Sequence, residues 1–375
     1  MRILVFNWRD LEHPHAGGAE VYTDAVAREW VRMGHEVTLF VSKSEGCKER
    51  EITSSGYNVI RRGSRHGVYR EARKFWRDEG NESFDLVVDE VNTRPFGCPR
   101  FVKGIPVVAL IHQVCREIWA YEAKWPLSWL GRYVLEPTWL WLYRDVPVVT
   151  VSESSRRSLA RYGLRLIEVV PQGTSCLGSA NGGVVKEVDP TFVFVGRLTA
   201  NKRPEDAVSA FEVLRGHLPN ARLWVIGTGP MEAQMRRCAS DGVTFFGRVS
   251  DVEKRSLVAR AHVLLATSVR EGWGLVVTEA ACVNTAACGY DVPGLRDSIG
   301  AAGGVLSASD PGSLAAAALR TYERVVSGDL IPRIAGVAPW GDVATGVIGA
   351  GHRLRRDHLD VGFIEPDPGT LGVGG

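Results

Sequence analysis

The stretch HVLLATSVREGWGLVVTEAAC, residues 262–282, carries the change of pattern that decides the fold. Its first part, residues 262–267, is a short apolar run typical of a buried strand, and the glycines of EGWG indicate a turn. Residues 275–281 have the composition of a helix start. This order places Glu271 at the carboxyl end of the strand and Glu279 one to two turns into the helix. Because ligands of open α/β sheets bind beyond that end, we expect both carboxylates to face one crevice.

These two carboxylates have a functional and a plain structural interpretation. Beside glycines and a helix N-terminus, they suit a polyhydroxylated ligand that carries phosphate, because backbone N–H groups are open to it there. In the plain alternative, one glutamate caps the helix and the other is a solvated helical residue. The segments around them favour the ligand.

Strand-like and helical segments alternate along most of the chain. The apolar runs are RILVFNW, HEVTLFVS, FDLVVDE, IPVVALIHQ and VPVVTVS in the first half, then TFVFVGR, ARLWVIG, VTFFG, HVLLATS and a run that ends near Val305. An amphipathic stretch over residues 19–33 follows the first of them. Such alternation predicts parallel doubly wound sheets, and two series predict two Rossmann-like domains with a cleft between them.

Domain boundaries follow from length and composition. A chain of 375 residues is more than one core usually holds. We predict a first domain over residues 1–173, a hinge rich in Gly, Ser and Asn over 174–189, and a second domain over 190–330. Residues 331–375 contain ten glycines, and we expect an irregular, loosely packed tail there.

The composition is that of a soluble globular protein, with 45% apolar and 23% charged residues. A net charge of +2 gives no argument for a nucleic-acid partner. The seven cysteines contain no CxxC pair, which fits a reducing cytoplasm better than a disulfide framework or a zinc site. The chain opens on the strand-like MRILVF and has no run of about 18 apolar residues, so we expect a cytoplasmic protein.

Glycines and cations occur where a bound phosphate would need them. Gly17 and Gly18 precede the helix that begins near Ala19, whose first N–H groups can approach an anion. Arg197 follows a buried strand and Lys202 lies five residues further on, where both cations would neutralise a diphosphate leaving group. Two solvated loop cations are the plain alternative.

His112 follows the apolar run VVALI, at the end of a predicted strand. An imidazole at that position can hydrogen-bond a sugar hydroxyl or transfer a proton. A purely structural histidine is the alternative. No carboxylate cluster with plausible ligand spacing lies near the proposed phosphate site, so we predict no metal.

Two other segments allow more than one interpretation. Residues 61–77 are basic, which usually marks a solvated helix face; contact with anionic lipid at the inner face of the membrane, or with a phosphorylated acceptor, is the alternative. Five of the eleven tryptophans lie within residues 119–141. We favour core packing for them over an interfacial or acceptor-binding helix.

Five motifs occur in an order and at spacings that resemble the retaining glycosyltransferases of family four, the group that contains sucrose synthase and many bacterial mannosyltransferases. They are AGGAE, VGRLTANKRP, VIGTGP, SVREGWGLVVTEA and YDVPGLRDS. The resemblance covers about residues 1–325. It implies the GT-B fold, in which two Rossmann-like domains face each other, the first binding mainly the acceptor and the second a nucleotide sugar.

The resemblance also implies roles for the motif residues. Glu279 would hold the ribose hydroxyls, Glu271 would orient the donor sugar, and the two cations would hold the diphosphate. Gly18 N–H would touch the phosphate, and His112 would contact the sugar near the reacting carbon. The implied catalytic residues are Glu271, His112, Arg197 and Lys202. The implied donor-binding residues are Gly17, Gly18, Gly196, Arg197, Lys202, Gly229, Arg248, Gly272, Trp273, Gly274, Leu275 and Glu279.

Two stretches depart from the family pattern. Residues 281–287 read ACVNTAA and lack the usual glycine and proline, although Asn284 adopts a left-handed conformation more easily than most residues. Trp340 is followed by GDVATGVIGAG, whereas family members have a helix there that returns to the first domain. This departure predicts weaker domain closure.

We therefore expect a retaining glycosyltransferase that moves a hexose-type sugar from a nucleoside-diphosphate sugar to a small-molecule, natural-product-like or lipid-linked glycan acceptor. We expect no cofactor and no obligatory metal, since cations can take a metal's place at the diphosphate. The base, the sugar, the acceptor and the oligomeric state stay open. A GT-B-like nucleotide-sugar epimerase and a non-catalytic nucleotide-sugar-binding protein are the alternatives.

Overall fold

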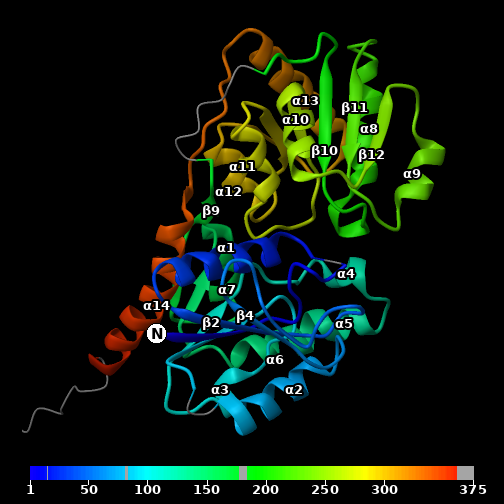
Figure 1. The fold of residues 1–375 in the computed structure, drawn as a ribbon. Helices are drawn as coiled ribbons and strands as arrows, with labels where there is room; N and C mark the ends of the chain where they lie inside the picture. The colour runs from blue at the N-terminus through cyan, green and yellow to red at the C-terminus, as the bar shows by residue number, and fades with distance from the viewer. Residues whose placement is uncertain (15, 81–82, 177–183, 361–375) are drawn as a thin grey trace, which may run out of the picture.

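The computed structural model describes residues 1–14, 16–80, 83–176 and 184–360, and two sheets form the centres of two domains (Figure 1). The first sheet has eight strands in the order β3-β4-β2-β1-β5-β6-β7-β8, all parallel except β3. These strands are β1 Arg2–Phe6, β2 Glu36–Val41, β3 Arg50–Ile52, β4 Asn58–Arg61, β5 Leu86–Glu90, β6 Val107–Leu110, β7 Val148–Thr150 and β8 Ile167–Val169.

Helix α1, Gly18–Arg32, shows how the sequence fixes the helices of this domain. The Gly17 N–H donates to the Glu20 carboxylate at 2.6 Å, which caps the first turn. Tyr22, Val26 and Trp30 follow at spacings of four residues and form its buried face. The other helical elements are α2 Val68–Phe75, η1 Trp76–Gly80, α3 Cys98–Phe101, α4 Trp119–Glu122, α5 Leu127–Leu130, η2 Gly131–Leu135, α6 Glu136–Trp141 and α7 Glu153–Ala160.

The second sheet has six strands in the order β12-β11-β10-β13-β14-β15, all parallel. They are β10 Thr191–Val195, β11 Arg222–Ile226, β12 Val243–Gly247, β13 Val263–Ala266, β14 Ala286–Tyr290 and β15 Val305–Ser307. Its helices are η3 Ala200–Lys202, α8 Pro204–Arg215, α9 Glu232–Cys238, α10 Asp251–Arg260, α11 Leu275–Ala281, α12 Leu295–Ala301 and α13 Pro311–Val326. The predicted pair of doubly wound parallel sheets is confirmed.

Two segments connect the domains, whereas the sequence predicted one hinge. The chain passes to the second domain after β9, Gln172–Thr174, and has returned at β16, Val337–Pro339; these two strands pair in parallel. The hinge predicted over 174–189 therefore begins inside a strand. Its residues 177–183 lie outside the described part of the chain. A methyl group added at Gly173 would lie 2.1 Å from the Trp340 ring, so the tryptophan packs directly on the backbone of β9.

The prediction of an irregular tail over 331–375 is wrong for its helical part. Residues Trp340–Asp360 form α14, which packs beside α1 on the first sheet, while 361–375 lie outside the described residues. The glycines that suggested looseness allow close packing instead. A methyl group at Gly351 would lie 2.6 Å from Val108 Cγ2, and one at Gly346 would lie 3.0 Å from Val170 Cγ1. The departure after Trp340 is thus a close helix–sheet contact.

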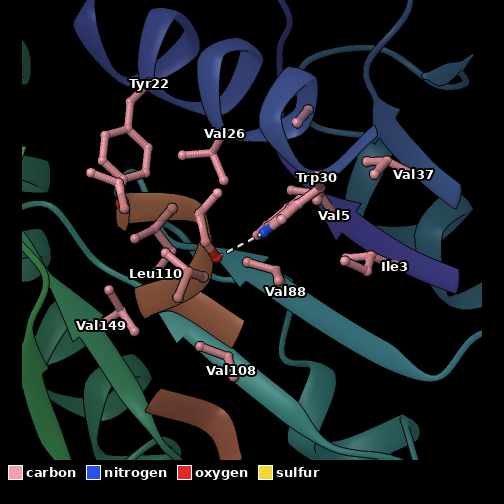
Figure 2. Packing of buried hydrophobic residues seen from close by; sticks show 14 of the residues in the cluster. Ile3, Val5, Tyr22, Val26, Trp30, Val37, Val88, Val108, Leu110 and Val149 are labelled. Atoms are coloured by element: carbon pink, nitrogen blue, oxygen red, sulfur yellow. Dashed lines mark hydrogen bonds between the residues drawn. The ribbon is translucent and has the colours of Figure 1, made fainter. Parts of the chain in front are cut away.

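Buried residues of α14 complete the core of the first domain. Val343, Ala344 and Val347 are fully buried between α1 and the sheet. The Trp30 indole N–H donates to the Ala344 carbonyl at 2.9 Å, as the dashed line in Figure 2 shows. Helix α14 is therefore an integral part of the first domain, although the whole second domain precedes it in the chain.

The structure also bears on two local expectations. Asn284 adopts φ = 57°, as predicted for the residue in place of the family's glycine.

The cysteine pattern predicted no disulfide, and that expectation is wrong for one pair: Cys176 at the end of the first connection is bonded to Cys282 at the end of α11. Sequence spacing gave no indication of this pair, because 106 residues separate the two cysteines.

The packing of α14 predicts that Val347→Asp destabilises the whole first domain. A carboxylate in a fully buried apolar site costs several kcal/mol, since it is neither hydrated nor paired there. Urea denaturation monitored by tryptophan fluorescence measures the loss. Thr345→Asp, on the exposed side of the same helix, is the matched control and should change stability by less than about 0.5 kcal/mol. Equal effects of the two substitutions would contradict this role for α14.

Candidate active site

Each sheet has a topological switch point, where consecutive crossovers leave in opposite directions. In the second sheet it lies between β10 and β13. The loop after β10 carries Arg197 and Lys202, and the loop after β13 carries Glu271. Ligands of such sheets bind beyond the strand ends at a switch point. The sequence-predicted cations and the first glutamate therefore lie at the expected binding edge.

The Lys202 ammonium forms an ion pair with the Glu271 carboxylate. Ser268 Oγ donates to the same carboxylate at 2.7 Å, and Thr267 Oγ1 donates to the Lys202 carbonyl at 2.7 Å. Arg197 is exposed beside them and has no ion pair with any described residue. One cation is thus held in place and a second is free to meet an anion.

Close backbone packing joins the loops after β10 and β11. A methyl group at Gly229 would lie 2.4 Å from the Leu198 carbonyl oxygen. At Gly227, with φ = 129°, it would lie 2.0 Å from the carbonyl oxygen of Gly196. Both glycines are thus required sterically, and the loop backbone, not a side chain, forms this wall of the site. Arg248 lies after β12 with an exposed side chain.

Glu279 lies in the second turn of α11, as its spacing from the turn predicted. Its carboxylate is 45% exposed and pairs with the Lys254 ammonium of α10 at 3.2 Å. Burial alone would lower the pKa of Lys254, but Glu279 and Asp251 beside it raise the pKa above its ordinary value. Lys254 was not predicted as a site residue, because only the fold brings α10 next to α11.

For the EGWG turn, the resemblance implies donor contacts from the backbone of residues 272–274, and the Trp273 side chain has a separate structural role. Gly274 has φ = 96° and precedes α11, a conformation that favours glycine. Trp273 is buried, and its indole N–H donates to Thr278 Oγ1 at 2.9 Å. Its ring packs in the core shared with α14. The Trp273 side chain therefore supports the turn, and only its backbone is free for a donor.

Residues of the two domains meet directly at this turn. A methyl group at Gly18, in the first turn of α1, would lie 3.1 Å from Leu275 Cδ1, and one at Gly272 would lie 2.9 Å from the His112 carbonyl oxygen. The predicted residues Gly17 and Gly18 are thus brought against the start of α11. His112 is brought against the turn that carries Glu271. The structure places both predicted halves of the site side by side.

His112 borders a buried polar cluster at the switch point of the first sheet, between β1 and β5. Its Nε2 lies 3.6 Å from a carboxylate oxygen of the fully buried Glu90, and its ring meets Tyr22 edge-on at 4.7 Å between centroids. Asn7 Nδ2 donates to Glu90 at 2.8 Å, and Thr23 Oγ1 also donates to it. Burial raises the pKa of Glu90. This carboxylate was missed, although it ends the apolar run FDLVVDE.

A partly buried ion pair crosses the domain boundary next to the site. Arg270 Nε donates to the Glu117 carboxylate at 2.5 Å, and Arg270 Nη1 donates to Ser158 Oγ at 3.3 Å. Burial alone would raise the pKa of Glu117, but the bond from Arg270 lowers it below its ordinary value. These contacts hold the loop before Glu271 against the first domain.

Glu136 connects the loop that follows His112 to α6. Its carboxylate accepts the Cys115 N–H and, at 3.2 Å, the Trp119 indole N–H. Burial raises its pKa to about 7, although both of these donors and Arg270 favour the charged form. The carboxyl group therefore titrates near neutral pH while it holds two elements of the first domain together.

Comparison with known proteins agrees with this arrangement. The sequence profile described as "Glycosyltransferase Family 4" matches residues 16–176, and that of "Glycosyl transferases group 1" matches residues 189–324. Together the two profiles span both domains. The chain belongs to the family-four glycosyltransferases. The GT-B architecture of two facing domains is the fold that the sequence motifs implied.

Curated relatives match parts of this glycosyltransferase family member at moderate identity. The 2-deoxystreptamine glucosyltransferase of Streptomyces kanamyceticus is 27% identical over 60% of this chain and 62% of its own length. An uncharacterized glycosyltransferase of Methanocaldococcus jannaschii is 25% identical over 80% of this chain and 83% of its own. The chain thus spans less than two thirds of the first relative. The putative glycosyltransferase EpsD of Bacillus subtilis is matched over 49% of its length.

Solved structures show the same fold at lower identity. Sucrose-phosphate synthase from Thermosynechococcus elongatus aligns with a TM-score of 0.67 and 17% identity over 96% of this chain and 97% of that chain. HepE of Anabaena, solved in complex with UDP-glucose, aligns with a TM-score of 0.64 and 16% identity over 96% and 100% of the two chains.

Two kinds of feature are absent from the described residues. No group of three or more His, Cys, Asp or Glu side chains among them could hold a metal ion. No helix formed by them is long and apolar enough to cross a membrane.

The raised pKa of Glu136 predicts a pH-dependent stability. The unfolded carboxyl ionises near pH 4.5 and the folded one near pH 7, so the folded state binds more protons in between. The free energy of unfolding should therefore fall as pH rises from about 4.5 to 7, by on the order of 2 kcal/mol from this group. The Glu136→Gln substitution should make the free energy of unfolding less dependent on pH in this range. Urea denaturation at pH 5 and pH 7.5 measures it, with the exposed Glu122→Gln as control; an unaltered pH dependence in Glu136→Gln would exclude this titration.

Proposed function

We propose that this protein is a retaining hexosyltransferase that uses a nucleoside-diphosphate sugar as donor. The observation that carries the proposal is the set of groups at the switch point of the second sheet: the Lys202–Glu271 pair with unpaired Arg197 beside it. Two cations at the carboxyl ends of parallel strands suit a diphosphate. His112 and the start of α1 lie directly opposite, on the other domain.

Departure of the nucleoside diphosphate is the step that these residues would assist. Negative charge grows on the leaving diphosphate as the glycosidic bond breaks, and Arg197 and Lys202 would stabilise it. Once the Lys202 ammonium faces the phosphate, Glu271 would accept hydrogen bonds from hydroxyls of the donor sugar. Glu279 would hold the ribose hydroxyls, and Lys254 would orient its carboxylate.

His112 would contact the donor sugar beside the reacting carbon. Glu90 faces its Nε2 and is itself fixed by Asn7 and Thr23, so the ring orientation is set before the donor binds. The split of these groups between two domains supports closure over the donor, which would exclude water from the reacting carbon. The second connection and α14 remove the reason to expect weak closure.

A uridine nucleotide is the first donor to test, because HepE was solved with UDP-glucose and the Streptomyces kanamyceticus relative is named a glucosyltransferase. We propose a small-molecule or lipid-linked acceptor and no required metal, since the two cations can serve the diphosphate. The epimerase and binding-protein alternatives are not favoured. The latter rested on residues 281–287 and the tail, and both fit the fold.

Donor binding should stabilise the protein, and Glu279→Ala should remove most of that effect. A ligand at 100 times its dissociation constant adds about 2.7 kcal/mol of stability, and the variant loses charge-assisted hydrogen bonds to the ribose. Thermal shifts with UDP-, GDP-, ADP- and dTDP-sugars in EDTA measure this. Glu323→Ala, exposed on α13, is the control and should respond as wild type. Wild-type donor response in Glu279→Ala would refute the ribose role; a response that needs added magnesium would refute the metal-free site.

Arg197→Ala and Lys202→Ala should lower the turnover number by at least tenfold and nucleoside-diphosphate binding by less. The reason is that an interaction that strengthens as the leaving group gains charge acts mainly on the transition state. Steady-state kinetics and product inhibition separate the two quantities. Arg237→Ala on the exposed side of α9 controls for the loss of one positive charge. Equal losses in turnover and in inhibitor binding would indicate ground-state binding alone.

A further inference from the structure

The tryptophan-rich segment of the first domain is exposed, contrary to the expected core packing. Trp125 is 81% exposed, Trp141 is 55% exposed and Trp129 is 53% exposed. Trp119 and Trp139 are the two that are partly buried. We call the exposed set the aromatic surface; it consists of Trp125, Leu127, Trp129, Leu130, Tyr133 and Trp141. Six large exposed apolar side chains within residues 125–141 are typical of an interaction site.

Most of the aromatic surface lies on one continuous helical segment. Elements α5, η2 and α6 follow one another without a break, so residues 127–141 form one helical rod. Trp129, Tyr133 and Trp141 are spaced by four and eight residues, and the wide π turn of η2 suits this spacing on one face. On the opposite face, a methyl group added at Gly131 would lie 2.3 Å from the Trp119 ring. This close contact holds the rod on the domain.

The charges around the aromatic surface are mostly positive. Lys124 and Arg116 are exposed and form no ion pair with described residues, and the Arg132 guanidinium lies 5.2 Å from the Tyr133 ring centroid. Two nearby carboxylates are withdrawn from this surface, Glu117 by Arg270 and Glu136 by burial, while Glu122 stays exposed. Tryptophan and tyrosine with flanking lysine and arginine are typical of a surface that lies in a membrane interface.

The basic segment 61–77, the alternative considered from sequence, is neutralised only in part. Arg61 is buried with Asp10 and Glu51, and Arg62 pairs with Glu49 and Glu79. Arg65, Arg73 and Lys74 are exposed and form no ion pair with described residues. Exposed tryptophan side chains, which suit insertion at headgroup level, lie in residues 121–141 instead.

The aromatic surface lies next to the candidate active site. Helix α4, just before Trp125, lies beside η3, which ends at Lys202. In Figure 1, α4 and α5 lie under the loops of the second domain. A bilayer on this surface would meet the protein at the edge where the two domains join.

We propose that the aromatic surface docks on an anionic phospholipid bilayer, with the tryptophan side chains inserted at headgroup level and Lys124 and Arg116 facing lipid phosphates. The docked protein holds its domain junction at the membrane surface, where a lipid-linked acceptor presents its head group. Only the identity of this acceptor rests on the proposed function. Binding to the bilayer itself requires neither donor nor turnover.

Vesicle co-sedimentation of the full chain tests the proposal. Wild type should bind vesicles of phosphatidylcholine and phosphatidylglycerol, and bind pure phosphatidylcholine at least several-fold more weakly. Trp125→Ala with Trp129→Ala should reduce partitioning at least tenfold, and Lys124→Glu should reduce it on anionic vesicles alone. Val252→Ala with Ile331→Ala removes exposed apolar side chains elsewhere and should bind as wild type.

Three further readouts make the outcome decisive. Thermal unfolding and the thermal shift with donor should match wild type in every variant, which separates lost docking from lost folding or lost donor binding. Absence of binding to either vesicle, or equal binding by wild type and the tryptophan variant, would overturn the proposal. So would a wild-type dimer in analytical ultracentrifugation that the tryptophan variant converts to monomer, because a second copy would then cover the surface.

Discussion

The chain crosses between the domains twice, after β9 and before β16, and these two strands are hydrogen-bonded to each other. After the second crossing, α14 is buried against α1 and the first sheet, so this helix belongs to the first domain. This double connection limits how the domains can turn relative to each other. It keeps the switch points of the two sheets, each of which offers half of the site, on facing sides. A hinge made of one flexible segment would not impose that constraint.

Two ion pairs hold four of the charged side chains of the site. Lys202 is held by Glu271, and Glu279 is held by Lys254. Each pair satisfies groups that would otherwise be costly at a partly buried edge. A bound diphosphate would replace Glu271 as the partner of Lys202. Ribose hydroxyls would replace Lys254 as the partners of Glu279. The pairs therefore keep the side chains close to a binding arrangement, and the unpaired Arg197 supplies the attraction for the incoming anion.

Misplaced expectations share one physical cause. The glycines after Trp340 predict looseness from the sequence alone, whereas Gly346 and Gly351 let a helix approach a sheet closely. Tryptophans in residues 119–141 were expected inside, whereas Trp125 and Trp129 lie outside. In both cases residue type describes what a side chain can do. The partner that it meets depends on elements far away in the sequence.

The sequence by itself determined the alternation of strands and helices, the EGWG turn with its two glutamates, and the left-handed Asn284, because hydrophobic periodicity and backbone preference are local properties. It also identified Arg197 and Lys202, since both follow a recognisable strand. Only the tertiary structure decided that Lys254 meets Glu279, that Glu90 faces His112, and that Trp273 is a packing residue. These contacts join elements from separate parts of the chain, and their geometry arises only when the sheets, the paired crossings and α14 have packed together.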